Sequence, residues 1–196
     1  MNRLLPKIDR NEHDVIKEFS TVENTLDAGV LVSIASSDPS ADELYQTTNS
    51  ILGSADHVLS PYWVNPNKVQ TATSGALRSQ VLGITLNEVR DYDEHGRKLL
   101  FEPQRKLELN ALISGDTVPI LRRGYITLSD AAFVGSPTKD SLGIVGSGGC
   151  IEAVTRAELT GRGLSNDYVI GKFISSTGNC GGYNRSGTYA YFLLDV

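Results

Sequence analysis

Residues that could bind a metal ion or form a disulfide framework are scarce in this sequence. Only two cysteines occur, Cys150 and Cys180; neither belongs to a C-x-x-C pair, and neither has a histidine at ligand spacing. A zinc site therefore has no support. We expect two reduced, small, partly buried side chains, although the spacing alone leaves a disulfide between them open.

Positive charge and long apolar runs are scarce too. The formal net charge is −5, whereas a protein that coats nucleic acid needs clustered Lys and Arg to meet the phosphates. No stretch approaches the roughly 18 apolar residues of a membrane span, and the first residues lack the apolar run of a secretory signal. We therefore expect synthesis in a cytoplasm, no membrane partner and no nucleic-acid partner.

The three histidines form no catalytic pattern. His13, His57 and His95 are predicted to lie on exposed, mutually distant segments, whereas a general base needs its partner within about 3 Å. Counted from Asp91, Gly96 and Glu102 occupy the sixth and twelfth positions of an EF-hand calcium-binding loop. The residues that follow resemble a β-strand and not the helix of an EF-hand, so we favour a charged β-hairpin.

The glycine-rich segment 146–150 (Gly-Ser-Gly-Gly-Cys) lacks the ending of a phosphate-binding loop, and we predict a turn between strands. No catalytic, metal-binding or cofactor-binding residue is therefore assigned, no cofactor is expected, and the chain is not expected to be an enzyme. An enzyme stays open only if the fold assembles reactive groups that the sequence hides.

Short β-like segments are abundant instead, and 40% of the residues are apolar, enough for a packed core. Turn signals recur every ten or so residues, which is typical of a sandwich or barrel-like domain over 67–196. Pro119 cannot donate to a ladder, so its strand should be an edge strand or carry a bulge. The predicted strands are 29–34, 81–86, 98–101, 106–111, 118–121, 124–128, 150–155, 168–174 and 189–196.

Residues 1–66 have a different character. The first twenty are polar with a few apolar anchors, equally compatible with a segment that orders on a partner and with a frayed helix at 12–19. Ser40 and Glu43 form a capping box, and the apolar spacing behind them predicts one short helix at about 40–52. We expect an extended N-terminal arm that includes this helix.

Two further segments could lie at an interface. Arg122 and Arg123, with Lys172 and Phe173, could form a basic, aromatic face of a nucleic-acid-binding barrel, although the acidic total favours a solvated or interface pair. Residues 178–187 form a glycine-rich stretch that contains Tyr183 and Arg185. This stretch is equally compatible with a contact surface and with a long hairpin loop.

Five segments taken together resemble the head decoration (cement) proteins of tailed bacteriophages, over about the last 125 residues. They are Val-Leu-Gly-Ile (81–84), Asp-Tyr-Asp-Glu-His-Gly (91–96), Val-Pro-Ile-Leu-Arg-Arg-Gly (118–124), Ile-Gly-Lys-Phe-Ile (170–174) and Tyr-Phe-Leu-Leu-Asp-Val (191–196). The resemblance implies a mainly β fold of the lambda-type or β-tulip kind, and a viral structural protein without catalytic residues.

The same resemblance implies a homotrimer on the outer surface of the capsid, with the arm lying across neighbouring major capsid proteins and cementing them. The implied arm contacts are Leu4, Leu5, Ile8, Phe19, Val30 and Val32. The implied contacts between subunits are Arg122, Arg123, Tyr183 and Arg185. The alternatives are another virion component, such as a tail-tube or head–tail joining protein, and a nucleic-acid-binding β-barrel.

Overall fold

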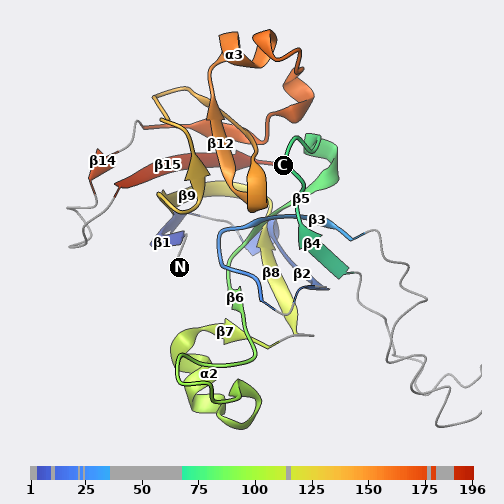
Figure 1. Cartoon of the computed structure of the whole chain (residues 1–196), viewed down its shortest axis with the longest axis vertical. Helices are drawn as coiled ribbons and strands as arrows, with labels where there is room; N and C mark the ends of the chain where they lie inside the picture. The colour runs from blue at the N-terminus through green and yellow to red at the C-terminus, as the bar shows by residue number, and fades with distance from the viewer. Residues whose placement is uncertain are drawn as a thin grey trace, which may run out of the picture.

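The computed structural model describes residues 4–9, 12–21, 23, 25–35, 68–113, 116–175, 178–179 and 188–196. These residues form a small, mainly β domain, as the sequence predicts. Figure 1 shows an open sheet at one end, a closed barrel in the middle and a short ladder with helix α2 at the other end.

Five strands close the barrel. All hydrogen-bonded neighbours are antiparallel except β2 and β4, which are parallel. Val, Ile and Leu dominate these short segments, and such side chains pack well on a pleated surface. In order around the barrel, the strands are β2 (Val15–Thr21), β4 (Lys68–Thr71), β3 (Leu31–Ile34), β5 (Val81–Thr85) and β8 (Thr117–Leu121).

The open sheet has eight strands, and its longest described ladder joins β9 to β15. Only β10 and β12 pair in parallel. The path is β1 (Leu4–Asp9), β9 (Arg123–Ser129), β15 (Thr188–Asp195), β13 (Gly171–Phe173), β11 (Leu142–Val145), β12 (Ile151–Val154) and β10 (Phe133–Val134), and β14 (Gly178–Asn179) pairs with β15.

Short helical segments and a two-stranded ladder complete the fold. Helix α3 begins at a capping box, in which the Glu158 N–H donates to Thr155 Oγ1 at 3.2 Å and the Thr155 N–H donates to Glu158 Oε2 at 2.7 Å. The segments are α2 (Pro103–Leu109), α3 (Arg156–Gly161), the 3₁₀ turns η1 (Glu12–Asp14), η3 (Arg78–Gln80), η4 (Leu99–Phe101), η5 (Ser147–Gly149) and η6 (Asn166–Tyr168), and the parallel ladder of β6 (Glu88–Val89) with β7 (Ala111–Leu112).

Two chain segments run side by side from the barrel into the open sheet. β1 pairs with β9 in the sheet, and β2 pairs with β8 in the barrel. Where the paired segments turn, the Arg122 N–H donates to the Asp14 carbonyl oxygen at 2.9 Å. The N-terminal strands are therefore part of both sheets.

This pairing corrects the expected N-terminal arm. Residues 4–34 supply β1, β2 and β3, which pair with strands from beyond residue 67, so position 66 does not separate an arm from a domain in the described residues. Val30 and Val32 expose 3% and 0% of their surface. The β-branched run at 29–34 is the strand that the sequence predicts, and it finds its partners inside the barrel. The helix predicted at 40–52 lies outside the described residues.

The strands predicted at 98–101 and 106–111 are wrong. The first segment forms η4, and the second falls largely within α2. Pro103 occupies the first turn of α2, where its missing N–H costs nothing, and Arg105 pairs with Glu108 one turn later. Helix-forming residues thus override the alternation of apolar and charged residues. As a result, Leu107 faces solvent instead of a core.

Pro119 lies in a strand that is paired on both sides, opposite a bulge. Ile16 pairs with Ile120 and Phe19 pairs with Val118, so two residues of β2 face the one proline of β8. The bulge removes the need for the N–H group that proline lacks. Of the two predicted alternatives, the bulge is confirmed.

The main core lies between the barrel and the open sheet. It combines Leu31, Ile84 and Leu121 from the barrel with residues of the sheet such as Phe192. Phe173 packs edge-on against Phe192, with ring centroids 4.9 Å apart. A second core cluster belongs to the barrel strands and the residues beside them, and a third lies between β11, β12 and α3.

The glycine-rich turn between β11 and β12 packs against the barrel, as a structural turn. A Cβ atom on Gly149 would lie 2.5 Å from Val30 Cγ1 and 2.9 Å from the Leu31 carbonyl oxygen. Nearby, the Gly75 N–H donates to the Val145 carbonyl oxygen at 3.0 Å. Glycine at 149 therefore allows the sheet to approach the barrel closely.

We predict that Gly149→Ala destabilises the protein much more than Gly148→Ala. Both residues have positive φ, +67° and +64°, so both substitutions carry the same backbone strain, but a Cβ at 148 meets nothing within 4 Å. We expect a loss of about 1–2 kcal/mol for Gly148→Ala and about 2–5 kcal/mol for Gly149→Ala, because overpacking adds to the strain. Urea unfolding of the two variants measures the difference, and equal losses would contradict the close approach.

Candidate interaction surface

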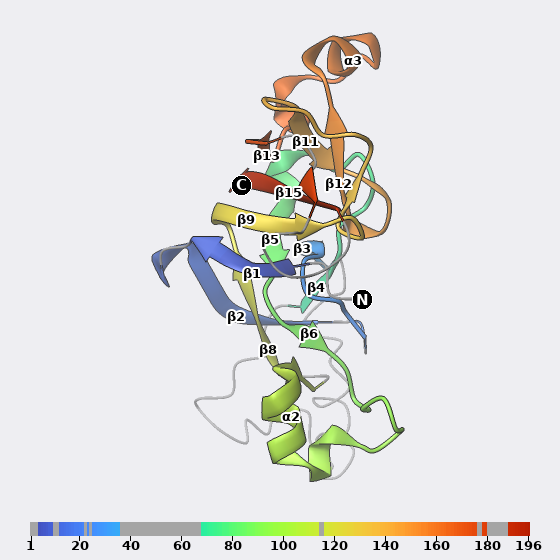
Figure 2. The same cartoon turned by 90° about the vertical axis from the view of Figure 1, so that its left-hand side faces the viewer.

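Residues 88–113 form a lobe between barrel strands β5 and β8, called here the α2 lobe. Its base is the β6–β7 ladder, joined to the barrel side by two backbone hydrogen bonds between Leu26 and Val89, with N···O distances of 3.0 and 2.7 Å. Val89 and Ala111 are buried at this base, and Leu99 is buried within the lobe. Both views show the lobe projecting from the end of the molecule opposite α3 (Figures 1 and 2).

The predicted turn at 93–96 is confirmed, and Asp93 organises it. One carboxylate oxygen, Oδ1, accepts hydrogen bonds from the N–H groups of His95 and Arg97, each at 2.8 Å. The hydrogen bond from the Arg97 N–H is the largest cause that lowers the pKa of Asp93 below its usual value. The carboxylate thus has a structural role inside the lobe.

Ion pairs connect further side chains on the surface of the lobe. Arg97 pairs with Glu102, and Arg105 pairs with both Glu94 and Glu108. Four of the five Lys and Arg side chains of the lobe have an acidic partner within it or at residue 116; the pairs not named above are Arg90–Glu88 and Lys106–Asp116. The charges of the lobe therefore largely neutralise one another.

At Asp116, hydrogen bonds and partial burial shift the pKa of the carboxyl group in opposite directions. Partial burial favours the neutral carboxyl, but the hydrogen bonds from Lys106 Nζ, at 2.6 Å, and from the Ile113 N–H, at 3.1 Å, outweigh it. The pKa of Asp116 is consequently lowered. The carboxylate ties α2 to the start of β8.

Large apolar side chains are exposed on this lobe. The exposed fractions are 79% for Leu107, 75% for Phe101, 57% for Leu100 and 55% for Tyr92. Only three other large apolar side chains of the described residues are exposed, namely Ile34, Tyr125 and Val134. Single exposed apolar residues are normal on a protein surface, but several on one small lobe indicate an interaction site.

Sequence reasoning missed this surface because it assigned 106–111 to a strand with the leucines inward. Two signals could have revealed it. Pro103 followed by Gln, Arg, Lys, Leu, Glu and Leu is typical of a helix start. The run Leu99-Leu100-Phe101 directly before it is too apolar for a solvated connection.

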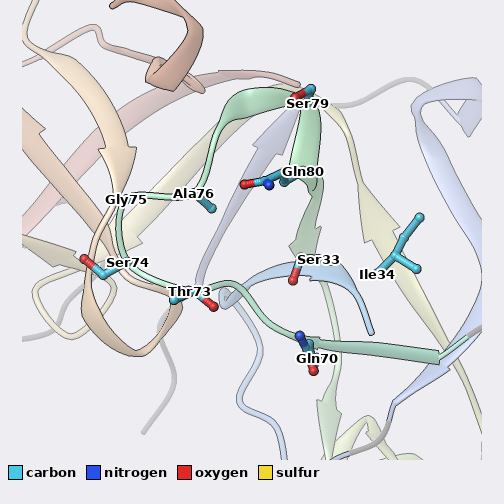
Figure 3. Close-up of a pocket in the computed structure, with 9 residues that line it drawn as sticks. All are labelled: Ser33, Ile34, Gln70, Thr73, Ser74, Gly75, Ala76, Ser79 and Gln80. Atoms are coloured by element: carbon cyan, nitrogen blue, oxygen red, sulfur yellow. The ribbon is translucent and has the colours of Figure 1, made fainter. Parts of the chain in front are cut away.

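A shallow hollow of about 490 Å³ lies beside β3 and β4 (Figure 3). Gln80 at its rim accepts a hydrogen bond from the Leu77 N–H, at 3.1 Å to Oε1. None of the described residues that line it is titratable, so these residues offer hydrogen bonds but no acid–base chemistry. They are Ser33, Ile34, Gln70, Thr73, Ser74, Gly75, Ala76, Ser79 and Gln80.

A second hollow, of about 830 Å³, lies against β2 and contains His13, Lys17 and Glu18 among its lining residues. His95 is exposed in the turn of the α2 lobe, and His57 lies outside the described residues. His13 and His95 therefore lie on different parts of the fold. No group of three or more His, Cys, Asp or Glu residues in the described part of the chain is arranged to hold a metal ion.

The arm residues named from the sequence have different positions. Leu4, Leu5 and Ile8 belong to β1, the first strand of the open sheet, and their side chains are not among those described. Phe19 is half-buried against the barrel cluster that contains Val30 and Val32. Val30 and Val32 are therefore buried within the fold, which corrects their assignment as partner contacts, whereas the assignment of the half-buried Phe19 stays a prediction.

The arginine pair lies at the junction of β8 and β9. Arg123 Nε donates to Asp195 Oδ1 at 2.8 Å, and Arg78 Nη2 donates to Asp195 Oδ2 at 3.1 Å. Arg122 is exposed, and its backbone carbonyl accepts from the Val196 N–H at 3.1 Å. These contacts bind the last two residues to the barrel and the sheet. Tyr183 and Arg185 lie outside the described residues.

Cys150 is half-buried at the end of the glycine-rich turn, and its Sγ lies 3.6 Å from the Ala131 carbonyl oxygen. Cys180 lies outside the described residues.

Comparisons with protein-family models, with curated proteins and with solved structures find no match to this chain. Among the helices of the described residues, none has the length and apolar character needed to cross a membrane.

We predict that the Asp93 turn loses its protection in acid. Because folding lowers the pKa of Asp93 from 3.8, its ionised form stabilises the folded state above that value. This stabilisation is lost as the pH falls through the lowered pKa. Amide hydrogen exchange at His95 and Arg97 should therefore accelerate as the pH falls from about 5 to about 2, after correction for intrinsic rates.

Asp93→Asn is the matched control, since its amide oxygen can still accept both hydrogen bonds but does not titrate. Its corrected exchange should be faster than that of the unsubstituted protein near neutral pH and should change little in acid. An equal acid response in both proteins would rule out Asp93 as the source.

Proposed function

We propose that this chain is a viral structural protein, a decoration protein that binds the outer surface of a tailed-bacteriophage capsid. It acts as a homotrimer that cements neighbouring major capsid proteins, without cofactor or catalytic step. It is synthesised in the host cytoplasm and is located on the exterior of the virion. The observation that carries the proposal is the set of exposed apolar side chains on the α2 lobe, because they give a small β-rich body a surface for the contact between copies that the proposed trimer requires.

The positions of four of the five sequence segments that resemble decoration proteins also support the proposal, whereas the fifth, 91–96, lies in the α2 lobe. The segments at 81–84 and 118–124 lie on neighbouring barrel strands, where Ile84 pairs with Leu121. The segments at 170–174 and 191–196 lie on neighbouring strands of the open sheet, where Phe173 pairs with Phe192. Segments distant in sequence thus form two paired sets at the centre of the fold, so the resemblance concerns the framework of the domain.

The physical demands of such a function fit these features. A cement protein needs contact area and repeated weak binding instead of reactive side chains, because a trimer on a repetitive lattice gains affinity from linked sites. By binding only the assembled shell, it stabilises that shell through mass action. Exposed apolar side chains on a stable β-rich framework supply contact area of this kind.

The proposal predicts that the purified full-length chain attaches to expanded capsids that lack their own decoration protein, and that the coated capsids resist heat better. Co-sedimentation measures attachment, and release of packaged DNA on heating measures resistance. Unexpanded capsids are the control and should bind less, because their lattice differs. A chain that co-sediments with neither kind of capsid at any concentration would refute the proposed function.

A further inference from the structure

We propose that the α2 lobe is the contact through which copies of this chain associate. This inference adds to the proposed function the surface through which the subunits of a homotrimer contact one another. The trimeric stoichiometry itself rests on the proposed function. The lobe of one copy therefore contacts the same lobe of a second copy of the chain.

The apolar area fits the centre of a protein interface. Leu100, Phe101, Leu107 and Tyr92 together expose on the order of 400 Å², given their exposed fractions and the size of such side chains. Summed over the lobe, this area is comparable to the area of a patch that marks an interaction site on a single chain. A stable interface buries roughly 800 Å² on each partner, arranged as an apolar centre with a polar rim. The four side chains can supply the centre, and the surrounding ion pairs can supply the rim.

The charges of the lobe favour a second copy over a charged partner. Arg97, Arg105 and Lys106 are each paired within the lobe or with Asp116. A surface whose charges are already neutralised does not repel its own copy, whereas like charges placed across an interface oppose association. Docking to a strongly charged surface would favour unpaired charges of one sign, and of the five Lys and Arg residues in the lobe only Lys98 has no acidic partner.

The position and rigidity of the lobe permit contact between copies. It extends beyond the barrel at one end of the molecule, away from the open sheet and α3 (Figures 1 and 2). Leu99 of η4 is buried and its N–H donates to the Asp91 carbonyl oxygen at 2.9 Å, and Arg105 of α2 pairs with Glu94 of the turn. Such preorganisation reduces the entropy lost on association.

Sedimentation velocity of the full chain over a wide concentration range tests the inference, using Phe101→Ser with Leu107→Ser. Because both side chains are largely exposed, the double variant should keep its thermal midpoint but associate about tenfold or more weakly. Val134→Ser is the matched control: Val134 is 51% exposed on β10 of the open sheet. This control should associate like the unsubstituted chain.

Hydrogen exchange of the unsubstituted chain gives a second readout that does not depend on a variant's folding. As the concentration rises, residues 99–109 should gain protection, whereas residues 156–161 of α3 should not. A chain that stays monomeric, association unaffected by the double variant, equal weakening by Val134→Ser, or protection confined to other segments would each overturn the inference.

Capsid binding separates this inference from the proposed function. If the chain associates through the lobe but never attaches to expanded capsids, the proposed function fails and the self-contact stands. If the chain attaches to capsids while residues 99–109 gain protection only there, the lobe contacts the shell, so the self-contact fails and the proposed function stands.

Discussion

The structure depends on one shared apolar layer between a closed barrel and an open sheet. Leu31, Ile84 and Leu121 contribute from the barrel, and Phe173 and Phe192 from the sheet. Neither part could keep this face in water without losing the hydrophobic stabilisation that offsets the conformational entropy of ordering the chain. The paired β1–β2 and β8–β9 segments, which pass from one part into the other, hold the two faces together.

That constraint also explains where contact with other molecules can occur. Residues at 30–32 are needed inside the fold, and the ends of β9 and β15 are joined through Arg123 and Asp195. The loop between β5 and β8 is less restricted, because only its β6–β7 base must meet the barrel. The exposed apolar side chains beyond that base contribute little to folding, so their exposure on the α2 lobe points to binding.

At two positions, the short sequence pattern was not enough to predict the observed secondary structure. At 106–111 the alternation of leucine with charged residues predicts a strand, but Pro103 at the helix start and the pairing of Arg105 with Glu108 make a helix the better local solution. At Pro119 the missing N–H leaves two options, an edge strand or a bulge. The partner strand decides between an edge strand and a bulge, because β2 supplies the extra residue that forms the bulge.

The sequence alone was sufficient to predict the β-rich class, the turn at 93–96, the structural nature of the glycine-rich segment at 146–149 and, after residue 81, strands β5, β8, β9, β12, β13 and β15, but not β11 at the centre of the open sheet. These features follow from short-range chemistry: β-branched runs, alternating burial and glycine at turns. Only the tertiary structure decided that residues 4–34 complete both sheets and that Leu107 is exposed. It also decided that Gly149 lies against Val30. These outcomes depend on which distant segments meet, and long-range pairing leaves no signature within either segment alone.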